Sequence, residues 1–441
     1  MKTLVLLAFL GALISPAFPQ FHGKPRHPRQ EPEETITETL SEVPGETPGE
    51  PTEEVVHEEE DTFYQSPVNK LATSISNFGY NLFRQLSNKN ANANIFVSPF
   101  GIATGLSELS LGASSRTQQL LHRALFYHVL SDPEIHSTYK ELLAGITGKG
   151  YKMATKIFLD KKVKANADFL NKVETLYGVR PSSLSGSIRT DVRSINDWIK
   201  QTTQGKVDKF LKGLPTSLSI LLLSAVHFKG QWAQKLNPRL SGIQEFHLDD
   251  IKSVKVPMMY GENYPAKFGF DSELNCKIAQ LQLTGDVSML IFLPNEVTKN
   301  FTLIEETLSA EFMHDTAKAL HDVKVNFRLP KINLAHDADF SNTLGEMDLR
   351  GLFQTPDFSK IAAGPTKITK VQHKAALELD ETGAELTDTA AAAARVTIST
   401  EYRVNRPFIF LIRDDITGSL LFIGKILDPK AMTAQEPRRR N

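Results

Sequence analysis

Residues 378–407 read ELDETGAELTDTAAAAARVTISTEYRVNRP, a long, alanine-rich stretch of mostly small and polar side chains. Apolar segments with the composition of β-strands lie on both sides of it, at residues 367–377 and 407–413. Loops of more than about 15 residues are uncommon in compact domains and are usually functional. Composition alone leaves two interpretations open, a disordered linker and an exposed loop held at both ends by a sheet.

Blocks of sequence on both sides of this stretch favour the exposed loop. They are RPFIFLIRDDITGSLLFIGKILDP at 406–429, NIFVSPFGIATGL at 94–106, VHFKGQW at 226–232 and LPKI at 329–332. Shorter matches are Leu111-Gly-Ala, Thr117 and Leu352-Phe. In this order the blocks resemble the serpin family over most of the chain. The resemblance implies an α+β serpin fold, with three β-sheets surrounded by eight or nine helices and an exposed reactive-centre loop at residues 383–404.

Composition sets further bounds on the chain. It has 441 residues, 41% of them hydrophobic, and a formal net charge of −1. Length alone suggests two or three domains, but the fold that the chain resembles is one large unit. The charge provides no global field for nucleic acid, so any polyanion site must be a local patch. Cys276 is the only cysteine, so no intrachain disulfide can form, and we expect a buried, inert thiol.

The ends of the chain predict a secreted protein. Residues 1–19 have one positive charge, a short apolar core and then small residues, which is typical of a secretory signal peptide. This core is too short to span a membrane, so we expect a soluble protein in the extracellular space. Residues 20–62 are acidic and rich in Pro, Glu and Thr, which predicts disorder. The serpin domain is then expected at 63–430 and a basic tail at 431–441, which is not an ER-retrieval signal.

Hydrophobic periodicity predicts several elements of the domain. Leu71, Ile75, Phe78 and Leu82 share one face of a first helix. Further helices are expected at 102–121, 135–143 and 187–203, the last with Val192, Ile195, Trp198 and Ile199 facing inward. Strands are expected at 151–163, 220–226, 278–283 and 287–293.

The beginning of the long loop predicts that the protein does not inhibit proteases. The resemblance implies that a cleaved inhibitory loop inserts into the main sheet, and alternate side chains then enter the core. Gly383 matches the hinge glycine of the family. The inward positions after it are Ala384, Leu386, Asp388 and Ala390, and a buried unpaired carboxylate at Asp388 is very costly. A register error of one residue would turn Glu385, Thr387 and Thr389 inward, which is no better.

The alternative is an inhibitory serpin with an unusual hinge. Its scissile bond would lie at Arg395, Val396, Thr397 or Ile398, where Arg395 suits trypsin-like enzymes. For a non-inhibitory chain, we expect cleavage there without trapping. The resemblance also places Ser98, Gly101, Ser224 and His373 beneath the main sheet, where they would control the opening of its strands.

Two groups of lysines predict glycosaminoglycan binding. Clustered ammonium groups attract sulfated and carboxylated polymers, although such a run is often only a solvated surface. The chain resembles a secreted, non-inhibitory serpin that signals to cells, with neurotrophic and anti-angiogenic activity. That resemblance implies a heparin or heparan sulfate site at Lys161, Lys162 and Lys164. It implies a hyaluronan site at Lys206, Lys209 and Lys212, where one further basic position is Gln204 here.

The same resemblance implies three further features. Collagen would bind at Asp271, Glu273 and Asp315, and a cell-surface receptor would bind within residues 91–147. Asn300-Phe-Thr302 is the only N-glycosylation sequon in the chain and should be modified in a secreted protein. We expect a monomer with no cofactor, metal ion or nucleic-acid partner. No catalytic motif is present, so we expect no enzyme, and a carrier of a small ligand stays open.

Overall fold

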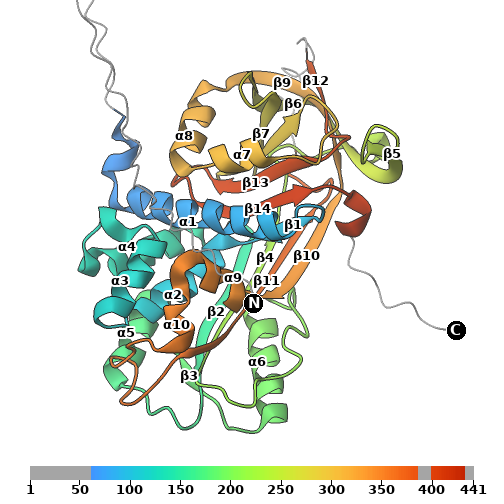
Figure 1. Ribbon diagram of the computed structural model, residues 1–441. Helices are drawn as coiled ribbons and strands as arrows, with labels where there is room; N and C mark the ends of the chain where they lie inside the picture. The colour runs from blue at the N-terminus through green and yellow to red at the C-terminus, as the bar shows by residue number, and fades with distance from the viewer. Residues whose placement is uncertain (1–60, 386–398, 433–441) are drawn as a thin grey trace, which may run out of the picture. The chain divides into compact units, whose positions relative to one another are not determined.

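The computed structural model describes residues 61–385 and 399–432. Ten α-helical segments occur in these residues, and three of them, α7, α9 and α10, have six residues or fewer (Figure 1). The helices are α1 Pro67–Lys89, α2 Pro99–Ser110, α3 Ser115–Ala124, α4 Asp132–Ile146, α5 Ala167–Tyr177, α6 Ile188–Thr202, α7 Thr302–Thr307, α8 Ala310–Ala319, α9 Ser341–Leu344 and α10 Gly351–Gln354.

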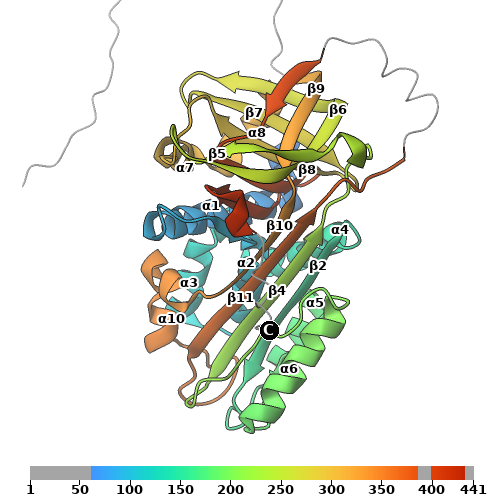
Figure 2. The same ribbon diagram turned by 90° about the vertical axis from the view of Figure 1, so that its right-hand side faces the viewer.

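One of the two sheets has five strands and includes β11, the strand that precedes the long loop (Figure 2). Its strand order is β10 (Ile332–Asp339), β11 (Ile368–Leu379), β4 (Ile220–Lys229), β2 (Tyr151–Leu159) and β3 (Ser182–Ser183). The central strands β4 and β11 are parallel to each other, whereas β10 is antiparallel to β11 and β2 is antiparallel to β4. β11 leads directly into the long loop, so the loop begins beside the central strand β4.

The second sheet has nine strands, which follow the order β1-β14-β13-β8-β7-β6-β9-β12 with β5 also on β6. They are β1 Ile95–Val97, β5 Gly242–His247, β6 Ser253–Asp271, β7 Cys276–Leu283, β8 Val287–Pro294, β9 His321–Pro330, β12 Thr400–Arg403, β13 Phe408–Asp414 and β14 Leu420–Ile426. The pairing of β6 with β9 shifts between Gly261 and Tyr264. β5 pairs with the first part of β6 and β7 with its last part. The second and third of the expected sheets therefore share β6 and β9.

Helices cover both faces of the five-stranded sheet. The α2 helix packs close against β4, because Gly101 and Gly105 carry no side chain where it meets Val226 and Leu222. On the other face, α6 packs Ile195 and Ile199 into a buried cluster with side chains of β2 and β4. The inward residues expected for this helix are confirmed.

The first helix is also confirmed, because Leu71, Ile75, Phe78 and Leu82 are fully buried. The helical region expected at 102–121 consists of two helices, because α2 ends at Ser110 and α3 begins at Ser115. The turn between them contains Gly112, where a Cβ would lie 2.1 Å from a side-chain carbon of Ile361. Only a glycine allows this turn to pack so closely against the segment that precedes β11.

The boundaries of the fold differ slightly from those expected. The acidic segment was expected to reach residue 62, but Asp61 and Thr62 belong to the described fold. Asp61 Oδ2 lies 2.7 Å from His314 Nε2 and accepts a hydrogen bond from Lys318 Nζ at 2.9 Å. The expected signal peptide and the rest of the acidic segment lie outside the described residues. None of the described helices is both long and apolar enough to cross a bilayer.

Candidate functional site

The base of the long loop is attached to the segment that follows β4. Trp232 N donates to Thr382 O at 3.0 Å, and Ala384 N donates to Trp232 O at 2.9 Å. Lys235 N donates in turn to Ala384 O at 2.8 Å. The chain beyond β11 is therefore hydrogen-bonded up to Ala384, two residues before the part of the loop that lies outside the described residues.

Gly383 is required at this position for a steric reason. A Cβ there would lie 2.6 Å from Trp232 O and 2.8 Å from Lys235 Cα. Both are backbone atoms, which cannot rotate out of the way as a side chain can. The hinge glycine inferred from the resemblance is thus a point of close approach between two backbone segments.

Three carboxylates near the loop base have basic partners. Glu385 Oε1 lies 2.5 Å from Lys235 Nζ. The largely buried Glu381 lies 2.8 Å from Lys331 Nζ. On β11, Glu378 Oε1 lies 3.0 Å from Nε2 of the buried His227 on β4. Burial is the largest influence on the pKa of His227 and lowers it, so the imidazole is neutral at physiological pH and contacts Glu378 through a hydrogen bond.

A strand that returns from the long loop could enter this sheet between β11 and β4. A segment that folds back after β11 runs antiparallel to β11, and β4 is parallel to β11. The segment would therefore be antiparallel to both strands if it entered between them. Insertion requires that the β4–β11 hydrogen bonds and the His227–Glu378 contact break first.

The four residues expected beneath the sheet are brought together. Ser98 N donates to His373 Nε2 at 3.3 Å. A Cβ on Gly101 would lie 2.6 Å from Ser224 Oγ, so a larger residue at 101 requires Ser224 to move. The sequence analysis missed Thr155, whose hydroxyl donates to Ser224 Oγ at 3.3 Å. Burial lowers the pKa of His373 to about 3, so this network is built around a neutral imidazole.

Most of the expected reactive-loop residues cannot be placed. Asp388, Arg395, Val396, Thr397 and Ile398 lie outside the described residues. Gly383 is the exception, at the loop base described above. On the far side of the loop, the chain is described again from Ser399, and β12 pairs in parallel with β9.

The two lysine groups lie near opposite ends of α6. Lys161, Lys162 and Lys164 are exposed in the turn after β2, and the side chain of Lys161 covers Gly186, which precedes α6. Lys206, Lys209 and Lys212 are exposed in the segment after α6. Because an α-helix rises about 1.5 Å per residue, the two groups are roughly 20 Å apart along the helix.

The sequence analysis missed basic residues between these groups. Arg189, Arg193 and Lys200 are exposed on α6. Lys200 Nζ lies 3.3 Å from Asp208, and Arg193 lies 4.0 Å from Asp197, so acidic side chains partly neutralise this surface. The four-residue spacing of Arg189 and Arg193 was the signal in the sequence that these two share a helical face.

The expected collagen-binding acids lie on neighbouring elements. Asp271 ends β6 and accepts hydrogen bonds from the backbone of Glu273 and Leu274. Asp315 is exposed on α8, which precedes β9, the strand beside β6. Leu320, at the end of α8, lies against Gly269 of β6. The three acids are therefore placed on joined elements, and Asp315 and Glu273 are exposed.

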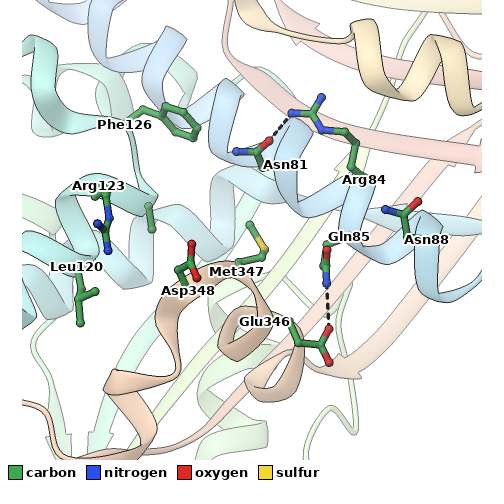
Figure 3. Close-up of a pocket in the computed structure, with 11 residues that line it drawn as sticks. Asn81, Arg84, Gln85, Asn88, Leu120, Arg123, Phe126, Glu346, Met347 and Asp348 are labelled. Carbon is green, nitrogen blue, oxygen red and sulfur yellow. Dashed lines mark hydrogen bonds between the residues drawn. The ribbon is translucent and has the colours of Figure 1, made fainter. Parts of the chain in front are cut away.

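The region expected to bind a receptor, residues 91–147, contributes α2, α3 and α4. Its side chains form one wall of a pocket of about 480 Å³, whose other walls come from α1 and residues 346–348 (Figure 3). Gln85 Nε2 donates to Glu346 Oε2 at 3.0 Å across this pocket. Arg84 reaches away from it and donates to the carbonyl oxygens of Glu305 and Leu308. The walls of the pocket are mixed, since α1 supplies mainly polar side chains whereas Leu120, Phe126 and Met347 are apolar, and none of its lining side chains has a buried polar atom without a partner.

The remaining candidate residues are simple to place. Asn300 is exposed between β8 and α7, and its side chain accepts a hydrogen bond from Thr302 N at 3.1 Å. Cys276 is fully buried, as expected, and burial raises its pKa to about 12. In the described part of the chain, no group of three or more His, Cys, Asp or Glu side chains could hold a metal ion.

Comparison with known proteins defines the class. The family model described as "Serpin (serine protease inhibitor)" matches residues 73–429, and the chain belongs to this family. Its fold matches human thyroxine-binding globulin complexed with thyroxine, with 26% identity and a TM-score of 0.74 over 82% of this chain and 100% of that one. It also matches mouse protein-Z dependent protease inhibitor, with 24% identity and a TM-score of 0.76 over 84% of this chain and 100% of that one.

Within the family, the chain is similar to one particular protein along almost its whole length. It is 44% identical to pigment epithelium-derived factor of Homo sapiens over 98% of this chain and 100% of that protein. The Bos taurus protein of the same name is 46% identical over 85% of this chain and 90% of its own length. Alpha-2-antiplasmin of Bos taurus is 32% identical over 82% of this chain and 72% of that protein.

Proposed function

We propose that this chain is a secreted, non-inhibitory serpin that acts as an extracellular signalling factor of the neurotrophic and anti-angiogenic type. In this proposal it binds heparin or heparan sulfate, hyaluronan and collagen, and acts as a monomer through a cell-surface receptor. The similarity to pigment epithelium-derived factor over both whole chains supports this type of serpin.

The charged base of the loop is the observation that carries the proposal. Glu385 is paired with Lys235 at the point where insertion would begin. Asp388 follows three residues later in the sequence. Insertion would require the Glu385–Lys235 pair to break and would bring Asp388 into the sheet, where an unpaired carboxylate is strongly unfavourable. The first residues of the inserted strand would then contribute less favourable free energy.

Incubation with trypsin tests this part of the proposal. We expect cleavage at Arg395 without a covalent complex that survives denaturing electrophoresis. Arg395→Ala should remove that cleavage product and leave the chain otherwise unchanged, which identifies the bond. A stable complex with trypsin, or with a chymotrypsin-like protease, would overturn the proposal.

An inhibitory serpin is the second candidate. The closed β4–β11 pair favours it, because a sheet that has not yet received its extra strand is what such a mechanism uses. Relatives named as inhibitors, such as alpha-2-antiplasmin, are also similar to this chain. The same electrophoresis separates the two candidates, since only the inhibitor forms the complex.

The exposed lysines at both ends of α6 support glycosaminoglycan binding. Two basic groups about 20 Å apart suit a long, flexible polyanion better than a single small anion. The acidic residues near the end of β6 and on α8 support collagen binding. They provide a negatively charged surface on elements other than those that carry the lysines. Collagen binding would be lost in an Asp271→Asn, Glu273→Gln, Asp315→Asn variant that still binds heparin.

Secretion and glycosylation at Asn300 belong to the same proposal. Asn300 is exposed in the segment between β8 and α7, which supports its modification by a glycan. A glycosidase that removes N-linked glycans should increase the gel mobility of the secreted chain. It should have no effect on an Asn300→Gln variant.

A further inference from the structure

A second cavity lies beside strand β2 of the five-stranded sheet. It has a volume of about 290 Å³ and is bounded by α2, β2 and the C-terminal ends of α4, α5 and α6. Its wall is mixed, with apolar groups such as Leu143, Ile146 and the ring of Tyr177 and polar side chains such as Lys152 and Gln204. A cavity of this size and character suits a small molecule with an apolar body and a polar group.

One buried polar group in this wall has no partner. Glu108 lines the cavity from α2 and is 1% exposed. Its Oε2 accepts no hydrogen bond from any described residue. Buried polar groups are nearly always hydrogen-bonded, so an exception of this kind indicates a missing partner.

The other buried polar side chains of the wall already have partners. Thr104 donates to Phe100 O at 2.8 Å, and Thr155 donates to Ser224 Oγ at 3.3 Å. The hydroxyl of Tyr177 lies 2.7 Å from His136 Nδ1, and that of Tyr151 lies 3.1 Å from Ser98 Oγ. Among the buried lining residues, Glu108 is therefore the group that offers an unused acceptor to a ligand.

No basic side chain of the described residues lies within ion-pair distance of this carboxyl group. Lys156 is the charged group with the largest opposing effect on it, but its Nζ lies over the ring of Trp198, 5.1 Å from the ring centre. Lys152 lines the cavity and is only half-buried. Neither lysine forms an ion pair with Glu108 in the described part of the chain. Burial raises the pKa of Glu108 well above its usual value, which favours the neutral form of the carboxyl group in the empty cavity.

We propose that this cavity binds a small, mainly apolar primary amine, with Glu108 as the counter-ion of its ammonium group. The apolar body of the amine would contact Phe100, Leu143 and Ile146. The ammonium group keeps its protons and donates a hydrogen bond to the Glu108 carboxylate. The proton of the carboxyl group is released to the solvent when the amine binds. This inference is independent of the matrix-binding function proposed above.

Calorimetry on the full chain with 2-phenylethylamine tests the proposal. Titration at neutral pH in two buffers of different ionisation enthalpy measures the protons released on binding. We expect proton release on binding, because burial favours the neutral carboxyl group in the empty cavity and the ion pair requires the ionised one. Two probes of similar shape, 2-phenylethanol and 3-phenylpropionate, should bind more weakly, and 2-phenylethanol should release no proton.

Two variants separate recognition by Glu108 from a general effect on the fold. Glu108→Gln keeps the shape of the side chain and should weaken amine binding at least tenfold, equivalent to ~1.4 kcal/mol. It should remove the proton release and leave binding of 2-phenylethanol unchanged. Val179→Trp narrows the cavity and should weaken all three probes while Glu108 stays in place.

Three results would overturn the inference. The first is no measurable binding of the amine, which means that the cavity holds water only. The second is equal binding of the amine and 2-phenylethanol without proton release. The third is preferential binding of 3-phenylpropionate, which would assign recognition to Lys152 instead of Glu108.

Discussion

Gly383 determines how closely the loop base can approach the segment after β4. The two backbones are joined by hydrogen bonds on both sides of this glycine, because Trp232 N donates to Thr382 O and Lys235 N donates to Ala384 O. Trp232 is fully buried, and its Nε1 donates to Asp380 O at 2.7 Å. The loop is therefore anchored through one tryptophan and one glycine.

Gly383→Ala should destabilise the fold by about 1–3 kcal/mol, because the new methyl group meets backbone atoms on both sides. Urea unfolding would measure this change. Gly213→Ala is the matched control, since a Cβ there has no heavy atom within 4 Å, and its effect should stay within about 0.5 kcal/mol. Equal stability of the two variants would show that the close approach at Gly383 has no energetic role.

His373 makes the stability of the fold depend on pH. Its folded pKa of about 3 lies below the ordinary value of 6.5, because the fully buried ring loses hydration when it is charged. Between these values the unfolded chain binds more protons than the folded chain, so stability falls as the pH is lowered below 6.5. Ser98 N already donates to Nε2, which leaves that nitrogen no place for a proton.

The contribution of His373 should be up to about 1.4 kcal/mol per pH unit in this range. Urea unfolding between pH 6.5 and 5, where carboxylates stay largely ionised, would measure it. His373→Gln should make the profile flatter, although it lowers the stability at pH 7. An unchanged slope in this variant would mean that other groups, such as His227, cause the pH dependence.

Among the elements, α6 joins the two proposed glycosaminoglycan sites. It packs one face against β2 and β4 through Ile195 and Ile199 and exposes Arg189, Arg193 and Lys200 on the other. Lys161, in the turn after β2, packs its side chain against Gly186, which lies just before this helix. A heparin chain that follows α6 would contact both lysine groups.

Replacement of Lys161, Lys162 and Lys164 by Ala should weaken heparin binding by roughly tenfold at physiological salt, because each exposed charge contact contributes up to ~1 kcal/mol. The salt needed for elution from immobilised heparin measures this. The control is Lys140, Lys252 and Lys255 to Ala, which removes the same charge from exposed positions on other elements. If both triple variants elute alike, binding depends on net charge and not on this site.

The elements most visible in the sequence are those with a strong local pattern. Apolar residues at helical spacing predicted α1 and α6, and short apolar runs predicted the strands β4, β7 and β8, because burial on one or both faces sets those patterns. The break between α2 and α3 was missed, since it depends on the packing of Gly112 against Ile361, about 250 residues later in the chain.

The candidate sites show the same limit. Exposed lysines and acids could be named from the sequence, because the resemblance supplied their positions. The partners of Gly383, the role of Thr155 and the isolation of Glu108 could not be predicted. In the sequence, Glu108 cannot be told from an ordinary acidic residue on a helix. Only the fold shows that it lines a cavity and has no counter-ion among the described residues.

In the whole molecule, two large regions meet at the point where the loop begins. The strands β4 and β11 of the five-stranded sheet end there. Trp232, which follows β4, contacts Tyr264 and Phe327 of the nine-stranded sheet at the same point. Opening between β4 and β11 would disturb the anchored loop base and the network around His373 together. Insertion would therefore have to break contacts at several points, and in our proposal the Asp388 carboxylate reduces what insertion would gain.

Heat denaturation of the intact chain and of the chain cleaved in its loop tests this claim most directly. If the severed loop does not insert, the two midpoints should agree within about 3 °C, equivalent to ~2 kcal/mol for a domain of this size. A midpoint that rises by roughly 20 °C or more on cleavage would indicate a new strand in the sheet. That result would contradict the account of this chain as a non-inhibitory serpin.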